Sequence, residues 1–527
     1  MLLSQIHTRQ IVIIGSHGNG ARTTDKAAAT GNMTCPERIV VLPKVEESPA
    51  AKVICLYPLH TTQYAASYAV QNPHREKTLS SLSSKPYHTP CQYSQPRTER
   101  VPPRSSGAGA GEHRSIDSST QKAKTNHLSI VQPQPSPNHI THPTPRMGKI
   151  ARIEYFRVPP RWLFVKITDQ NNNTGWGEAS LEGHTQSVEG CLDAWREQYT
   201  GLEADDIEQI WQMSWRKSFY RGGPVLMSAL SGLDIALWDL KARKLNVPIY
   251  QLLGGKLRSK VKVYAWIGGD RPSDVEQAAL ARKAQGFTAV KMNATEDLAW
   301  LDSPAELTSC VERVKAVKAH GLDVGVDFHG RLHRPMAKQL AALLAPLQPL
   351  FVEEPLLSEH VEAVRTLAGQ VAVPVALGER LHSRWDAKPF LEASCVDILQ
   401  PDICHVGGIS ELRRMAAMAE AYDVPIAPHC PLGPIALAAN LQVAAATPNF
   451  AIQEMSLGIH YNVGGYDLLS YITNPDIWDV KDGYVELMDG PGLGISVNED
   501  LVREASKGAE AWVSPGFVGP GGELREW

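Results

Sequence analysis

The sequence lacks three features that would assign it to other classes of protein. No apolar run approaches the roughly 18 residues needed to cross a bilayer, and none near the N-terminus is long enough for a secretory signal peptide. The 52 basic residues are matched by 56 acidic ones, so the composition has no positive excess for binding nucleic acid. The eight cysteines form no CxxC pair, which favours a reducing compartment, the cytoplasm, over a disulfide-bonded secreted protein.

Residues 1–146 also lack apolar periodicity. From about residue 61 they are rich in Ser, Thr, Pro, Gln and His, and such a composition buries too little apolar surface to offset the entropy of folding. The glycines after Ile11–Ile14 match neither the dinucleotide-binding spacing nor the P-loop. We therefore expect a disordered extension over residues 1–146, which an over-extended gene model would explain. A transit peptide is the weaker alternative.

An ordered pattern begins at Met147. Strand-like runs at residues 149–158, 162–168 and 176–179 are followed by helical periodicity as far as Leu245. Strands followed by helices predict an α+β capping domain over residues 147–258.

Beyond residue 258, strand-like and helical runs alternate. Their spacing of about 25 residues predicts a (β/α) barrel over residues 259–470 rather than an open, doubly wound sheet. We expect the last segment, residues 471–527, to pack back on the capping domain. The strand-like runs are residues 261–266, 289–292, 324–328, 350–352, 373–377, 396–399, 425–427 and 451–453.

Titratable side chains end nearly every predicted barrel strand. In a barrel of this kind the active site lies at the carboxyl ends of the strands. Burying so many charges together is costly unless a cation and mutual pairing offset the cost. These residues are Lys291, Asp327, His329, Glu353, Glu379, Asp402, His429 and Glu454.

Three carboxylates recur at equal spacing on successive strands. Asp327, Glu353 and Glu379 are 26 residues apart each time, since 353 − 327 and 379 − 353 are equal. One such residue alone is more often a turn cap or a surface ion pair. Three hard oxygen ligands at neighbouring strand ends predict a Mg²⁺ site, and the absence of a Cys/His cluster disfavours zinc.

Two histidines follow predicted strands. Alternation along a strand would point Asp327 and His329 to the same side. Asp402 ends the strand before His429, and a His–Asp pair orients the imidazole and raises its basicity, as a general base requires. Both imidazoles are therefore candidates for proton transfer.

The strand-end motifs as a set resemble the enolase superfamily, mandelate racemase subgroup, and are most similar to the D-galactonate dehydratases. The resemblance extends from Met147 to Trp527 and implies a (β/α)7β TIM-like barrel with an N-terminal α+β capping domain. It also implies Mg²⁺, an aldonate substrate and a homo-oligomer, with no nucleic acid or membrane partner. The motifs are Lys291-Met-Asn293, Asp327-Phe-His329-Gly-Arg331, Glu353-Glu-Pro, Gly-Glu379-Arg, Gln-Pro-Asp402 and His429-Cys-Pro-Leu-Gly-Pro-Ile.

The resemblance implies a role for each catalytic candidate. His429, held by Asp402, would remove the C2 proton of D-galactonate to give an enediolate, and His329 would protonate the departing 3-hydroxyl. Glu454 would hydrogen-bond a substrate carboxylate oxygen, and Lys291 would add positive charge. The product would be 2-dehydro-3-deoxy-D-galactonate and water.

One departure from the subgroup favours elimination. Racemases carry a second lysine where this chain has Asn293, which cannot accept a proton. A dehydratase of gluconate or mannonate, an epimerase on the same fold, and a non-catalytic relative all remain open. Specificity would depend on loops near Arg161-Trp162 and Phe219–Pro224.

Overall fold

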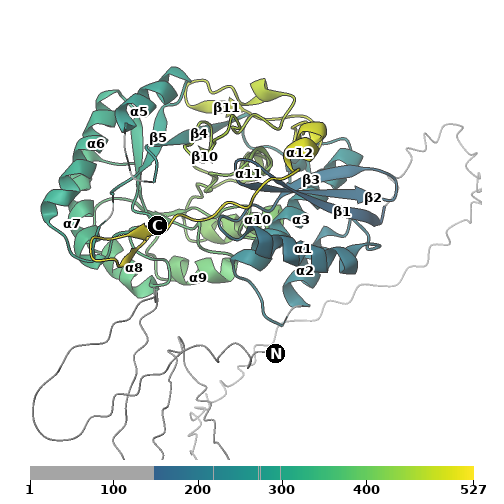
Figure 1. The fold of residues 1–527 in the computed structure, drawn as a ribbon, viewed down its shortest axis with the longest axis horizontal. Coiled ribbons are helices and arrows are strands. Elements are labelled where there is room, and N and C mark those ends of the chain that lie inside the picture. The colour runs from purple at the N-terminus through teal and green to yellow at the C-terminus, as the bar shows by residue number, and fades with distance from the viewer. Residues whose placement is uncertain (1–147, 218, 271, 273, 297) are drawn as a thin grey trace, which may run out of the picture. The chain divides into compact units, whose positions relative to one another are not determined.

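The computed structural model describes residues 148–527 apart from residues 218, 271, 273 and 297, so the extension predicted over residues 1–146 lies outside the described residues. The described chain forms an N-terminal module and a barrel (Figure 1). Among the described helices, none is both long and apolar enough to span a bilayer.

The N-terminal module is an antiparallel sheet with helices packed on it. The central strand is buried at every position, and α3 packs along it and along β3. The approach is close, because a side chain at Gly175 or Gly177 would lie 2.1 or 2.0 Å from a backbone oxygen of α3. The elements are β1 (Ile150–Val158), β2 (Trp162–Asp169), β3 (Thr174–Glu178), α1 (Thr185–Tyr199), α2 (Ile207–Arg216), α3 (Pro224–Lys244) and α4 (Ile249–Leu252).

The barrel strands are parallel and follow one another in chain order, and the last pairs with the first, which closes the sheet. The predicted strand at residues 425–427 is a single bridging residue, Ile426, which pairs with Leu399 and Phe450. The predicted (β/α)7β barrel and α+β module are confirmed. The strands are β4 (Lys260–Ile267), β5 (Ala289–Asn293), β6 (Asp323–Asp327), β7 (Val352–Glu353), β8 (Val375–Leu377), β9 (Ile398–Leu399) and β10 (Gln453–Met455).

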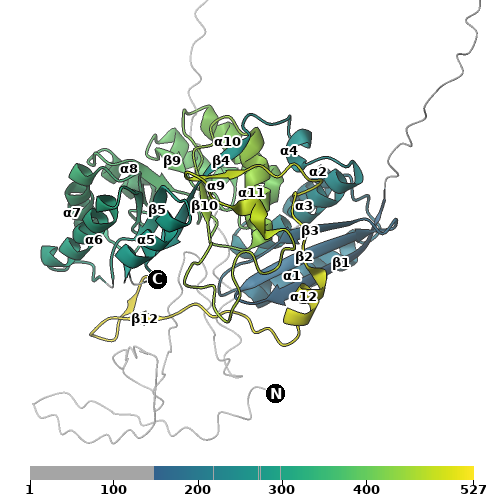
Figure 2. The same ribbon diagram turned by 90° about the horizontal axis from the view of Figure 1, so that it is seen from above.

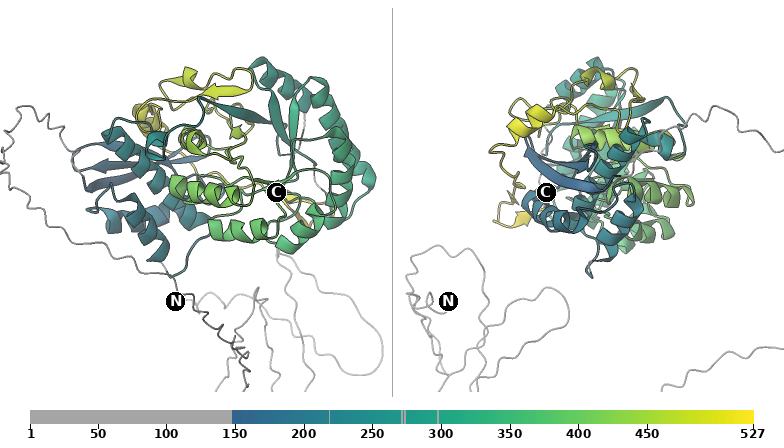
Figure 3. Two further views of the ribbon diagram at one scale, coloured as in Figure 1. Left: turned by 180° about the vertical axis from the view of Figure 1, so that it is seen from behind. Right: turned by 90° about the vertical axis from the view of Figure 1, so that its right-hand side faces the viewer.

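Helices α5 to α9 line the outside of the barrel (Figures 2 and 3). Valine, leucine and alanine side chains between these helices and the strands form much of the main core. The helices are α5 (Val275–Ala284), α6 (Thr308–Ala319), α7 (Arg334–Leu344), α8 (Val361–Ala368), α9 (Arg384–Glu392), α10 (Gly408–Glu420) and α11 (Pro434–Ala446), with 3-10 turns at Pro304–Leu307 and Ala345–Leu347.

The chain after the barrel returns to the N-terminal module. Helix α12 lies beside β1 (Figure 2). Its Arg503 pairs with Glu154 of β1 at 3.1 Å, and its Glu499 pairs with Lys166 of β2 at 2.6 Å. The remaining elements are a 3-10 turn at Pro475–Trp478, β11 (Tyr484–Glu486), which pairs with β4, α12 (Glu499–Ala505), and the hairpin of β12 (Phe517–Val518) and β13 (Leu524–Arg525).

Candidate active site

A cavity of about 370 Å³ lies at the carboxyl ends of the barrel strands, within the size range of small-molecule sites. Side chains from the barrel, from the N-terminal module and from the last residues of the chain line it. Glu353 and Asp402 do not line the cavity themselves. Each contacts a residue that does, Glu353 at 2.7 Å from Lys291 and Asp402 at 2.8 Å from His429. The lining includes the predicted residues Lys291, Asp327, His329, Glu379, His429 and Glu454.

The three predicted metal ligands converge. Each of Asp327, Glu353 and Glu379 offers a carboxylate oxygen, and these oxygens lie within 4.8 Å of one another. Asp327 and Glu353 are register partners at the ends of β6 and β7, so strand pairing itself brings them together. Burial, and next the charge of Asp327, raise the pKa of Glu353 well above its ordinary value. Carboxylates this close repel one another when ionised, so a cation bound between them would be stabilising.

Lys291 supplies one positive charge to this group. Its Nζ lies 2.7 Å from Glu353, 3.1 Å from Glu454 and 3.6 Å from Asp327. Burial alone would lower the pKa of Lys291, but the surrounding carboxylates, Glu353 foremost, hold it well above its ordinary value. One ammonium cannot neutralise four carboxylates, so the excess of negative charge remains.

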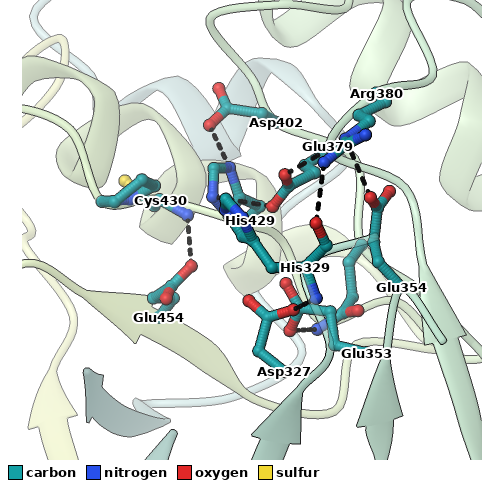
Figure 4. A network of polar contacts seen from close by, with 12 residues as sticks. Asp327, His329, Glu353, Glu354, Glu379, Arg380, Asp402, His429, Cys430 and Glu454 are labelled. Atoms are coloured by element: carbon teal, nitrogen blue, oxygen red, sulfur yellow. Dashed lines mark hydrogen bonds and ion pairs between the residues drawn. The ribbon is translucent and has the colours of Figure 1, made fainter. Parts of the chain in front are cut away.

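His429 lies between two carboxylates. Its Nδ1 is 2.8 Å from Asp402 and its Nε2 is 3.2 Å from Glu379. Figure 4 draws both contacts. Burial opposes the charged imidazolium, but Glu379 and the hydrogen bond to Asp402 outweigh burial and raise the pKa of His429 to about 10. Asp402 thus fixes the ring through Nδ1 and leaves Nε2 toward the cavity.

His329 reaches the cavity by a turn rather than by strand alternation, so the predicted reason for its direction is wrong. Strand β6 ends at Asp327, and His329 has a φ of +53°, in the left-handed region. Its backbone N–H donates to Asp327 Oδ1 at 2.7 Å, and its carbonyl accepts from Arg380 at 3.0 Å. Arg380 is held in turn by buried Glu354 at 2.9 Å. Burial lowers the pKa of His329.

The last predicted site residue, Glu454, is also buried, as is Asn293, the residue that departs from the racemase pattern. Glu454 accepts a hydrogen bond from the backbone N–H of Cys430 at 2.9 Å, which ties it to the loop that holds His429. Asn293 lies on β5 together with Lys291, lines the cavity and donates to the carbonyl of Asp270 at 3.3 Å.

Part of the cavity lining was not predicted from the sequence. Arg161 was expected near the site and lines it, whereas Phe219 and Tyr220 are 89% and 81% exposed and lie outside it. Seven further polar or aromatic lining residues belong to loops, whose positions no strand pattern predicts. They are Glu182, Asp270, His382, His405, Tyr461, Glu526 and Trp527.

Comparison with known families decides the relationship. Residues 158–254 match the N-terminal domain of the mandelate racemase and muconate lactonizing enzymes, and residues 273–501 match the enolase C-terminal domain-like family. A D-galactonate dehydratase from Variovorax paradoxus is 46% identical over 382 residues, which cover 72% of this chain and 100% of the relative. The chain belongs to the mandelate racemase subgroup of the enolase superfamily.

Other members of the superfamily agree with this assignment. A D-galactonate dehydratase from Ralstonia pickettii is 46% identical over the same shares of the two chains, 72% and 100%. An enolase from Agrobacterium radiobacter, solved with sodium and L-malate, is 33% identical with a TM-score of 0.66 over 72% of this chain and 100% of that one. An enolase from Pantoea ananatis, solved with D-gluconate and magnesium, is 26% identical with a TM-score of 0.60 over 68% and 94%.

Proposed function

We propose that this protein dehydrates a sugar acid, converting D-galactonate into 2-dehydro-3-deoxy-D-galactonate and water. The observation that supports this most is the presence of two imidazoles, His329 and His429, on the wall of a cavity that lies beside the carboxylate trio. Elimination needs a group that takes a proton from C2 and another that gives one to the leaving hydroxyl. The relatives named D-galactonate dehydratase support the choice of substrate.

The donor set fits Mg²⁺. It consists of three carboxylates and no sulfur or imidazole, and their excess negative charge is not neutralised by Lys291 alone. Asp327, Glu353 and Glu379 would hold the ion. When bound, Mg²⁺ supplies positive charge that stabilises the anion developing on the substrate as C2 loses its proton.

The protein's own residues move the protons. A cation held by Glu379 would offset the charge that raises the pKa of His429, so that the neutral ring can take the C2 proton on Nε2. Asp402 at Nδ1 keeps the ring in place and stabilises the resulting imidazolium. His329 gives a proton to the 3-hydroxyl, the C3–O bond breaks, and water leaves. The enol that remains takes a proton at C3 and becomes the 2-keto product. Lys291 and Glu454 orient the substrate carboxylate.

A panel of aldonates tests the proposal. We expect the purified protein with Mg²⁺ to convert D-galactonate into a 2-keto-3-deoxy acid, detected by its reaction with semicarbazide. D-gluconate and D-mannonate are the matched comparisons, because D-gluconate differs from D-galactonate only at C4. Turnover of one of these instead would reassign the substrate, and no turnover of any aldonate would reject the dehydratase proposal.

Isotope exchange at C2 distinguishes the roles of the two histidines. We expect His329→Asn to stop dehydration, with a loss of about 10²- to 10⁴-fold, while C2 of D-galactonate still exchanges with deuterated solvent. His429→Asn should stop both reactions. Equal loss of exchange and dehydration in His329→Asn would contradict the division of roles.

A further inference from the structure

The last residues of the chain reach the candidate acid. Residues 509–527, which we call the tail, leave the region of α12 and end at the cavity, whose wall includes Glu526 and Trp527 (Figure 1). The Nδ1 of His329 donates a hydrogen bond to the backbone oxygen of Trp527. The two rings also meet edge to face, with centroids 5.9 Å apart.

A chain of aromatic contacts holds Trp527 at this point. Its ring packs on Trp512 at a centroid distance of 5.3 Å, and Trp512 meets Tyr461 edge to face at 5.7 Å. The guanidinium of Arg161 lies 3.9 Å from the centre of the Tyr461 ring. Trp527 therefore rests on residues from both the N-terminal module and the barrel.

The start of the tail is attached to the N-terminal module. The carbonyl of Ala509 accepts a hydrogen bond from Arg157 at 3.3 Å. Ser514 lies so close to Gly183 that a β-carbon there would be 2.3 Å from the serine oxygen. In contrast, Val513 and Leu524 are each 80% exposed, so the tail directs its indoles inward and aliphatic side chains outward.

The two candidate histidines share one arrangement. Each imidazole has Nδ1 bonded to an acceptor oxygen, from Asp402 for His429 and from Trp527 for His329. A bond at one ring nitrogen sets the direction of the ring and leaves the other nitrogen for the reaction. The acceptor for His429 is a side chain of the barrel, whereas the acceptor for His329 comes from the far end of the chain.

We propose that Trp527 is a positioning residue, which holds the imidazole of His329 with Nε2 toward the substrate, so that the tail completes the acid half of the site. The inference rests on the proposed dehydratase function, because it explains how the candidate acid is aimed. It concerns the orientation of the ring and assigns no proton transfer to the tail. The step in which His429 acts does not involve the tail.

Substitutions in the tail separate positioning from folding. A chain ending at Arg525 lacks both the ring and the acceptor oxygen, and we expect its dehydration of D-galactonate to fall about 100-fold. Its C2 exchange in deuterated solvent should stay within about threefold of the wild-type rate, since His429 is untouched. Trp527→Ala keeps the backbone oxygen and should lose about tenfold, and Trp527→Phe should recover most of that loss.

The control is Leu524→Ala, which changes an exposed side chain of the same hairpin and should leave both rates unchanged. Dehydration by the shortened chain at the wild-type rate or faster would overturn the inference, the faster rate meaning that the tail obstructs the site. Equal loss of exchange and dehydration would also overturn it, because the tail would then only support the fold.

A chemical readout makes the test independent of turnover. Diethylpyrocarbonate acylates accessible imidazole nitrogens, and mass spectrometry reports the rate at His329. We expect about tenfold faster modification of His329 in the shortened chain, with His429 as the internal reference. An unchanged rate would overturn the inference. A wild-type protein that dehydrates no aldonate would instead reject the proposed function and leave this readout to decide on the tail.

Discussion

Two groups of buried carboxylates differ in what surrounds them. At the barrel rim, Asp327, Glu353 and Glu379 face one another, and Lys291 is shared between Asp327 and Glu353. In the N-terminal module, Glu178, Asp234 and Asp239 are equally buried, but each has its own hydrogen-bond donors, from the barrel for the first two and from the segment after the barrel for Asp239. Both groups are buried, so the feature that distinguishes the proposed metal ligands is their convergence on a common point.

The interface group is satisfied by hydrogen bonds. Glu178 accepts from the backbone N–H of Gly433 at 2.8 Å and of Ala436 at 2.9 Å, at the start of α11. Asp234 accepts from the N–H of Ser410 at 2.9 Å and from its hydroxyl at 2.6 Å, in the first turn of α10. These acids join the two parts of the fold and have no unmet charge to share with a ligand.

Removing a charge at the rim should have the largest effect, and on activity alone. Asp327→Asn keeps an oxygen to accept from the backbone of His329 but removes one of the three proposed metal ligands. We expect turnover of D-galactonate to fall about a thousandfold or more. The midpoint of urea unfolding should move little, because the substitution is close to isosteric and relieves repulsion among the carboxylates.

Chelation provides the control for this variant. Treatment of the wild-type protein with EDTA should produce the same loss, and added Mg²⁺ should restore activity to the wild type but not to Asp327→Asn. Full activity of the metal-free wild-type protein would show that the rim carboxylates have another purpose.

Removing an interface acid should lower the stability of the fold and leave activity unchanged. Asp234→Ala leaves the N–H and the hydroxyl of Ser410 without their acceptor in a buried place. We expect the free energy of unfolding to fall by about 3 kcal/mol, measured in urea, with kcat for D-galactonate unchanged at a temperature where the variant is folded. Asp234→Asn, which keeps one acceptor oxygen, is the matched variant and should lose less. A large fall in kcat with stability intact would erase the distinction between the two groups.

The sequence was informative for the rim because a parallel barrel gathers the carboxyl ends of its strands. The equal spacing of Asp327, Glu353 and Glu379 identifies neighbouring strand ends without any knowledge of loops. Position along a strand did not explain His329, whose left-handed turn depends on the acceptor that Asp327 offers.

The interface and the tail left no such signal. The donor N–H of Gly433 lies 255 positions after Glu178, and the oxygen of Trp527 lies 198 positions after His329. Both contacts depend on how loops and helices dock, which neither composition nor periodicity specifies. An acidic residue in the sequence of β3 or α3 therefore predicts a polar position but not the groups that donate hydrogen bonds to it.

The smallest effect we expect is a pH dependence of stability from the interface. Burial, opposed by the hydrogen bonds from Ala436, Ser180 and Gly433, raises the pKa of Glu178 from 4.5 to about 7. A carboxyl with a raised folded-state pKa binds its proton more tightly when folded, so its contribution is complete below the unfolded pKa and is lost as pH rises toward 7. Glu178→Gln cannot titrate, and its unfolding free energy should fall by about 2 kcal/mol less than that of the wild type between about pH 5.5 and about pH 7.5.

A double variant provides the control. Because Asp234 also has a pKa raised to about 7 by burial, part of the fall in unfolding free energy with pH should persist in Glu178→Gln and disappear in the double variant with Asp234→Asn. Parallel pH profiles for wild type and Glu178→Gln would mean that Glu178 stays ionised and that its three donors outweigh burial.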